Sequence, residues 1–146
     1  MDIQKISKEL GISRSTLVEY ISFLEGTYFI KTIRPYSKGR NSEIRKMPKI
    51  YFCDSGLANH LANLEMGKLF ENNVFQNLRL KGEVNYYQRK SGTEIDFILN
   101  KSMAYEVKLN PQESDLKKLK EMCKELNLKN FNIISKNYTE SVSYTH

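Results

Sequence analysis

Two segments of alternating apolar residues, 94–99 and 103–109, constrain the fold of this chain more than any other stretch. In a strand, successive side chains point to opposite faces. One face of the first segment then carries three apolar side chains: Ile95, Phe97 and Leu99. The polar residues 100–102 between the segments have a common length for a hairpin loop. The sequence therefore predicts an antiparallel hairpin in which Leu99 pairs with Met103.

The same pairing predicts a close pair of carboxylates. Counted outward from the loop, Asp96 comes opposite Glu106, and Lys108 lies two residues along on the face of Glu106. Opposed like charges destabilise a sheet by up to about 1 kcal/mol, unless a cation lies between them or one is protonated. Mg²⁺ binds few protein carboxylates and keeps waters that a phosphate can replace. We expect a Mg²⁺ site here, in which Mn²⁺ can substitute; the alternative is a solvated face on which Lys108 is an ion-pair partner.

The surrounding periodicity predicts an α/β core in residues 66–146. Four further elements are expected there: a helix at 68–80, a strand at 84–89, a helix at 116–126 capped by Ser114 or Asp115, and a strand at 131–135. Because a helix connects the last strand back to the sheet, we expect that strand to run parallel to its neighbour. The resulting order is αβββαβ.

Residues 1–65 have the pattern of a winged helix. Two short helices flank Leu10-Gly11-Ile12-Ser13, and two strands, at 29–35 and 49–54, flank a basic loop. In a DNA-binding module of this kind, contacts come from the start of the second helix and from the wing. The residues expected to make them are Arg14, Ser15 and Thr16 on the helix and Lys38 and Arg40 on the wing. The alternative is a connector between proteins, because Glu19 and Glu25 on the same helix would repel phosphate.

The hairpin also carries a motif: Gly92-Thr93-Glu94-Ile95-Asp96-Phe97, followed by Glu106-Val107-Lys108. It resembles the D…(D/E)-x-K signature of the restriction-endonuclease-like, PD-(D/E)xK superfamily. Together with residues 86–92 and 49–57, the chain more narrowly resembles the uncharacterised domain that follows the ATPase module of archaeal-type AAA ATPases.

This resemblance implies a winged helix joined to a restriction-endonuclease-like core, with Asp96, Glu106 and Lys108 as catalytic residues. It also implies that Glu71, from the helix before the sheet, completes the metal site; the alternative for Glu71 is a solvated position. Arg89 and Lys90 at the rim are candidates for phosphate contact, or simply for surface solvation. The chain would be the C-terminal part of an ATPase whose nucleotide-binding module it lacks, since no Gly-x-x-x-x-Gly-Lys-Ser/Thr motif is present.

Composition leaves these functions open. A net charge of +6 permits nucleic-acid contact without requiring it. Two widely spaced cysteines, Cys53 and Cys123, predict reduced thiols, and the absence of a long apolar run predicts no membrane span; we expect a cytoplasmic protein. Three functions remain: a Mg²⁺-dependent nuclease acting on DNA, a non-catalytic interaction or regulatory module of an AAA ATPase, and a winged-helix transcription factor with a sensory domain. The sequence defines no oligomeric state.

Overall fold

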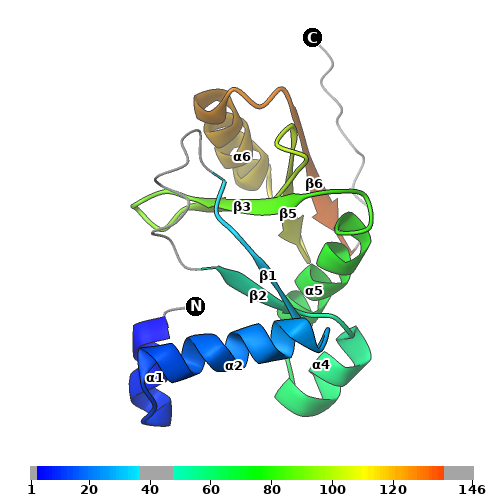
Figure 1. The fold of residues 1–146 in the computed structure, drawn as a ribbon. Helices are drawn as coiled ribbons and strands as arrows, with labels where there is room; N and C mark the ends of the chain where they lie inside the picture. Colours follow the sequence, from blue (N-terminus) through cyan, green and yellow to red (C-terminus); the bar gives the residue numbers. More distant parts are fainter. Residues whose placement is uncertain (1–2, 37–47, 137–146) are drawn as a thin grey trace.

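The computed structural model describes residues 3–36 and 48–136. The described residues of the N-terminal half form three helices and a two-stranded antiparallel hairpin. In chain order these are α1 (Ile3–Leu10), α2 (Arg14–Gly26), β1 (Ile30–Ile33), β2 (Lys49–Phe52) and α4 (Ser55–Ala62). Figure 1 shows the hairpin lying between these helices and the larger sheet. The expected wing contacts Lys38 and Arg40 lie outside the described residues.

The second half follows the order αβββαβ that the periodicity predicts. Its elements are α5 (Met66–Leu78), β3 (Val84–Gln88), β4 (Glu94–Leu99), β5 (Met103–Lys108), α6 (Glu113–Leu126) and β6 (Asn130–Ser135). The strands form one sheet in the order β3-β4-β5-β6. β6 runs parallel to β5, as expected for a strand reached through a helix. The chain is thus a mixed α/β protein.

Short polar side chains begin the helices where the sequence suggests. Ser13 accepts a hydrogen bond from the Thr16 amide at the start of α2, and Asp54 accepts one from the Leu57 amide at the start of α4. The expected cap of α6 is wrong: the helix starts at Glu113, and the Asp115 side chain accepts from the Gln112 amide at 2.9 Å. This reciprocal contact replaces a simple Ser or Asp cap. None of the helices in the described residues has the length and apolar character needed to cross a membrane.

The predicted hairpin register is confirmed near the loop, where Leu99 pairs with Met103 and Phe97 with Tyr105. One predicted face is wrong, however. On the other side of β4, Asn85 pairs with Ile98 but Tyr87 pairs with Ile95, so β4 has one extra residue there. This β-bulge turns Ile95 toward α6 together with Ile98, whereas Phe97 and Leu99 pack on the α5 side. Asp96 lies in the bulge.

The sheet separates two hydrophobic clusters, with α5 on one side and α6 on the other (Figure 1). The α5-side cluster includes Ile33 and Tyr51 from the N-terminal hairpin. The Tyr51 ring stacks on Phe75 at 4.4 Å and lies 5.4 Å from the Phe97 ring. The hairpin and the sheet therefore share one core, and this shared core holds β2 against the sheet. The division at residue 65 into two subdomains stays a prediction.

Candidate functional site

Charged side chains from four elements meet at the end of β4 and β5 that lies away from the hairpin loop. We call them the carboxylate–lysine cluster: Glu71, Glu94, Asp96 and Glu106 with Lys49, Lys68 and Lys108. Three of the predicted site residues, Asp96, Glu106 and Lys108, come from the β4–β5 hairpin, and Glu71 comes from α5. The cluster thus contains all four residues that the motif indicated.

Asp96 lies at the centre of the cluster and is only 7% exposed. Its Oδ2 accepts a hydrogen bond from the Val107 amide at 2.8 Å, and its Oδ1 lies 3.8 Å from Lys49 Nζ. Burial, followed by the charge of Glu106, raises the pKa of Asp96 to about 7, although Lys49 and the Val107 amide oppose the rise. Asp96 and Glu106 are therefore close enough for each to feel the charge of the other.

Glu106 is buried and only half satisfied. Its Oε1 pairs with Lys108 Nζ at 2.8 Å, whereas its Oε2 is buried without a hydrogen-bond partner among the described residues. Burial alone would lower the pKa of Lys108, but the ion pair with Glu106 raises it. Lys108 is thus a charged neighbour of the carboxylate pair, as the motif predicts, and Glu106 has an oxygen still available to a cation.

Glu71 faces the cluster from α5 and has three partners of its own. Its carboxylate accepts from Tyr51 Oη and from Lys68 Nζ, each at 2.8 Å, and lies 3.9 Å from Lys49 Nζ. Burial opposes ionisation, but these partners together lower the pKa of Glu71 below its ordinary value. The predicted solvated alternative for Glu71 does not fit a carboxylate that is 12% exposed.

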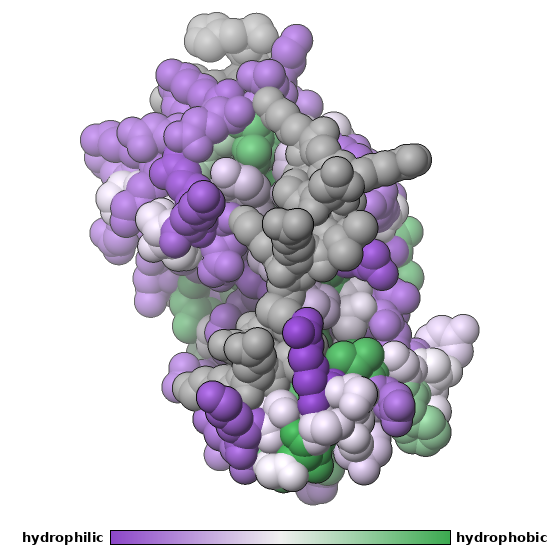
Figure 2. All heavy atoms as spheres, turned by 60° about the vertical axis from the view of Figure 1, so that its left-hand side comes forward, coloured by the Kyte–Doolittle hydropathy of each residue, from purple (hydrophilic) through white to green (hydrophobic). Residues whose placement is uncertain are grey.

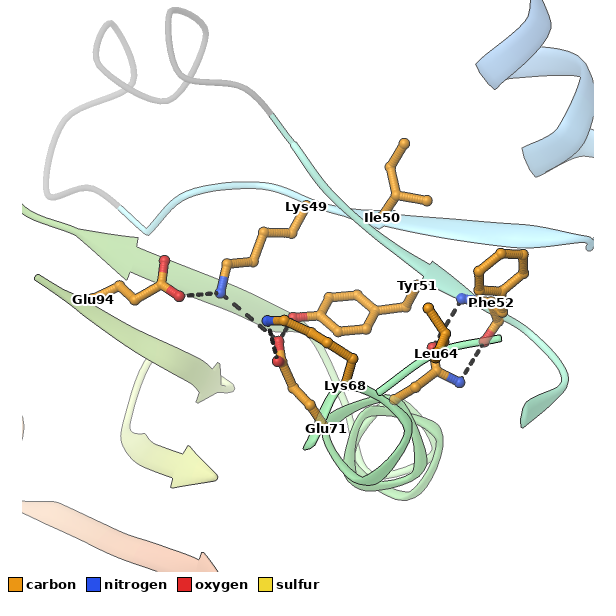
Figure 3. A pocket seen from close by; sticks show the side chains of 9 residues that line it. Lys49, Ile50, Tyr51, Phe52, Leu64, Lys68, Glu71 and Glu94 are labelled. Carbon is orange, nitrogen blue, oxygen red and sulfur yellow. Dashed lines mark hydrogen bonds and ion pairs between the residues drawn. The ribbon is translucent and has the colours of Figure 1, made fainter. Parts of the chain in front are cut away.

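The sequence interpretation missed three residues of the cluster, Lys49, Lys68 and Glu94, and Lys49 has the most contacts of the three. Lys49 is the first residue of β2, and its Nζ lies 3.0 Å from Glu94 Oε1, between that carboxylate and Glu71 (Figure 3). One signal in the sequence could have indicated it: alternation along β2 puts Lys49 and Tyr51 on the same face, and Tyr51 is a large aromatic residue suited to a core.

Cavities open on both sides of the cluster. One, of about 360 Å³, is lined by Lys49, Lys68 and Glu71 beneath the β2 strand (Figure 3). The other, of about 190 Å³, lies against α6 and is lined by Glu106, Lys108 and Lys118 among others. Glu94 lines both. Each cavity thus has room for a phosphate group beside two lysines: Lys49 and Lys68 in the first cavity, and Lys108 and Lys118 in the second.

The remaining predicted contacts are not part of the cluster. Arg89 forms a two-pronged ion pair with Glu125 of α6, at 2.7 and 3.1 Å, so it joins a strand to a helix. Lys90 is exposed in the β3–β4 turn, and Arg14 and Ser15 are exposed in the first turn of α2.

The exposed surface of α2 is not purely basic. It also carries Tyr20, which is 56% exposed, and Phe23, which is 68% exposed. The face shown in Figure 2 is mainly hydrophilic, with apolar side chains in small separate patches. DNA contact through α2 stays a prediction.

The donor atoms suit a hard divalent cation, although the present arrangement is not a ready metal site. In the described part of the chain, no three carboxylate, imidazole or thiol groups are grouped so that they could hold a metal ion. Mg²⁺, however, is bound through one or two carboxylates plus waters and phosphate. Asp96 and Glu106 supply two such carboxylates, and Glu106 Oε2 is a buried oxygen with no hydrogen-bond partner among the residues that the structure describes. The donor atoms of those two residues are of the kind that Mg²⁺ and Mn²⁺ prefer.

Fold and site together define a mixed α/β protein with a buried carboxylate–lysine cluster at one end of its sheet. The chain belongs to the family described as domain of unknown function DUF4143, whose model matches residues 66–145. A second model, domain of unknown function DUF8612, matches residues 1–68. No curated protein and no solved structure matches the chain.

Proposed function

We propose that this chain is a Mg²⁺-dependent, nuclease-like module that hydrolyses phosphodiester bonds of DNA. The observation that carries the proposal is the buried pair Asp96 and Glu106, with Lys108 in contact with Glu106 at 2.8 Å. Two carboxylates that are shielded from water, together with one neighbouring amine, make up the residue set of the D…(D/E)-x-K signature. The order αβββαβ supports a restriction-endonuclease-like core, and α1, α2 and the β1–β2 hairpin support a winged helix.

The four predicted side chains of the cluster each have a role in this proposal. Asp96 and Glu106 would hold the ion, and Glu71 would approach it from α5. When bound, Mg²⁺ supplies Lewis-acid polarisation of the phosphodiester and an acidified water. Lys108 is positioned to stabilise negative charge that develops on the phosphate. The Val107 amide fixes Asp96 through its hydrogen bond to Oδ2, which orients the other oxygen toward the cluster.

The test is cleavage of plasmid and single-stranded DNA with and without Mg²⁺. We expect Asp96→Asn and Lys108→Met to lower the Mg²⁺-dependent rate by at least about a hundredfold, the scale of removing one group that stabilises a transition state. Glu83→Gln is the matched control, because Glu83 is an exposed carboxylate paired only with Lys101 among the described residues. Equal residual cleavage by the wild type and both variants would identify a contaminating nuclease and remove the proposal.

A second candidate is a non-catalytic interaction or regulatory module of an AAA-type ATPase. Two observations favour it. Lys49, Lys68 and Lys108 already pair with the carboxylates, and α2 exposes Tyr20 and Phe23, which suit protein contact better than phosphate. Calorimetric titration with Mn²⁺ separates the candidates. Heat that disappears in Asp96→Asn supports the nuclease, whereas no heat in the wild type supports the interaction module.

A further inference from the structure

Lys49 occupies the middle of a carboxylate cage. Its Nζ lies 3.0 Å from Glu94, 3.8 Å from Asp96 and 3.9 Å from Glu71. These carboxylates come from β4 and α5, whereas Lys49 comes from β2, more than twenty residues away in sequence from the nearest of them. A single ammonium group thus lies among three carboxylates from two other elements, in the way that a cation lies among oxygen ligands.

Several contacts keep Lys49 in this position. The Lys49 side chain is only 17% exposed, and its Nζ lies 5.3 Å from the centre of the Tyr86 ring, a favourable place for a cation. Further along β2, Asn72 accepts from the Phe52 amide and donates to the Phe52 carbonyl, which fixes the strand to α5. Lys68, by contrast, is 66% exposed and has Glu71 as its ion-pair partner.

The charges of the cluster still leave room for another cation. Among the described residues it contains four carboxylates and three lysines, and Lys108 pairs with Glu106 rather than with the cage. Glu106 Oε2 is buried and has no hydrogen-bond partner within residues 3–36 and 48–136. Removing a partner from a buried ion pair is strongly destabilising, so each of these carboxylates needs either a nearby positive charge or a proton.

We propose that the Lys49 ammonium holds the place of the divalent cation and must withdraw before the ion binds. This inference rests on the proposed function and adds two roles to it. Glu94 becomes a ligand of the ion, and the β2 strand becomes a built-in competitor of the metal. The three carboxylates of the cage lie 3.0 to 3.9 Å from the Lys49 nitrogen, farther than Mg²⁺–oxygen distances of about 2.1 Å, so they would have to move closer together around an ion that replaces the ammonium group.

The test compares the Mn²⁺ affinity of four chains by calorimetry: the wild type, Lys49→Met, Lys49→Arg and Lys101→Met. We expect Lys49→Met to bind Mn²⁺ about tenfold more tightly than the wild type, within the usual range of coupling between two binding events. Lys49→Arg keeps the competing charge and should show no gain. Lys101→Met removes an exposed lysine whose partner, Glu83, is also exposed and lies outside the cluster, and it should change the affinity less than about threefold, the scale of an exposed pair.

Thermal melting gives a second readout that needs no catalysis. In chelator, Lys49→Met should melt below the wild type, because it leaves carboxylates unpaired in a buried cluster. Mn²⁺ should raise its melting temperature by more than that of the wild type, because the ion then supplies the missing charge. If Lys49→Met does not fold in chelator, Lys49→Gln, which keeps a hydrogen-bond donor, is measured in its place.

The outcomes separate this inference from the proposed function. In one outcome the wild type binds Mn²⁺ in a way that depends on Asp96, while neither Lys49→Met nor Lys49→Gln binds Mn²⁺ more tightly than the wild type. That result overturns the inference and leaves the nuclease proposal standing. If Lys49→Arg raises the Mn²⁺ affinity as much as Lys49→Met does, the inference is also overturned, because the competing charge would then have no effect on binding. Absence of binding in every chain overturns both. Binding in Lys49→Met alone supports the competitor role even if the wild type cleaves no DNA.

Discussion

Asp96 is a buried carboxylate whose neighbours act in opposite directions. Burial and the charge of Glu106 favour its protonated form, whereas Lys49 and the Val107 amide favour its charged form. The first two dominate, so the pKa of Asp96 rises to about 7. At neutral pH this carboxyl is therefore poised to release a proton when a cation arrives, as expected of a metal ligand.

A pH dependence of stability follows from this shift. Between about pH 4 and pH 7 the folded protein keeps a proton on Asp96 that the unfolded chain has lost. The free energy of unfolding is therefore highest at the acid end of this window and falls as the pH rises through 7. We expect the wild type to lose a few kcal/mol between pH 5 and pH 8, and Asp96→Asn to lose much less. Chemical denaturation at several pH values in chelator measures both.

Asp54→Asn is the control for that experiment. It makes the same chemical change at an exposed carboxylate that caps α4, and asparagine is an equally good cap. This variant should keep the pH dependence of the wild type. Parallel curves for Asp96→Asn and the wild type would show that another group causes the effect.

At the scale of elements, α5 and β2 are joined by one buried side chain. Asn72 is 3% exposed and forms hydrogen bonds with the Phe52 amide, the Phe52 carbonyl and Ser55 Oγ. Gln76 also donates to the Phe52 carbonyl. Helix and strand are thus fixed in a register that brings Glu71 to Lys49. Arg89 has a comparable role on the other side of the sheet, where its ion pair with Glu125 ties the end of β3 to α6.

We expect Asn72→Ala to lower the free energy of unfolding by about 1–3 kcal/mol, because it leaves the Phe52 amide buried without a partner. The neighbouring Asn73 is exposed on the same helix, and Asn73→Ala should change stability by no more than about 0.5 kcal/mol. Urea denaturation of both variants measures the difference. Equal stability of the two would mean that the Asn72 hydrogen bonds do not fix β2 to α5.

At the scale of the whole molecule, the N-terminal half supplies part of the hydrophobic core of the C-terminal half. Ile33 and Tyr51 belong to the core cluster on the α5 side. The segment after β1 also covers the free edge of β3. There the Tyr36 backbone amide donates to the Tyr86 carbonyl, and the Tyr86 backbone amide donates to the Arg34 carbonyl. An uncovered edge strand is prone to pair with other chains, so this contact protects the sheet as well as stabilising it.

We therefore expect residues 66–146, produced alone, to be poorly folded. Without Tyr51 the rings of Phe75 and Phe97 lose an aromatic partner, and β3 loses its cover. The isolated part should melt without a cooperative transition, bind a hydrophobic dye and associate in solution, whereas residues 1–146 should melt cooperatively. Circular dichroism and light scattering measure this. A sharp transition in the isolated part at the temperature of the whole chain would show that the shared core is dispensable.

Local sequence pattern by itself determined the elements and much of their order. Alternation predicted the β4–β5 hairpin and its Leu99–Met103 pairing, and the periodicity of residues 66–146 predicted the order αβββαβ. The motif indicated Asp96, Glu106, Lys108 and Glu71, which do meet in one cluster. Apart from Glu71, which only the family resemblance implied, these features were predictable because they depend on neighbours within a few residues, or on a spacing that the hairpin itself sets.

Only the tertiary structure decided the rest. The bulge that turns Ile95 toward α6 depends on the pairing of β4 with β3. The ion pair of Arg89 depends on Glu125 of α6. The position of Lys49 depends on the packing of the β1–β2 hairpin against α5. No local pattern contains these contacts, because each is stabilised by burial and charge pairing between segments far apart in sequence. The charge that balances the buried carboxylates is therefore set by how the two halves of the chain pack together.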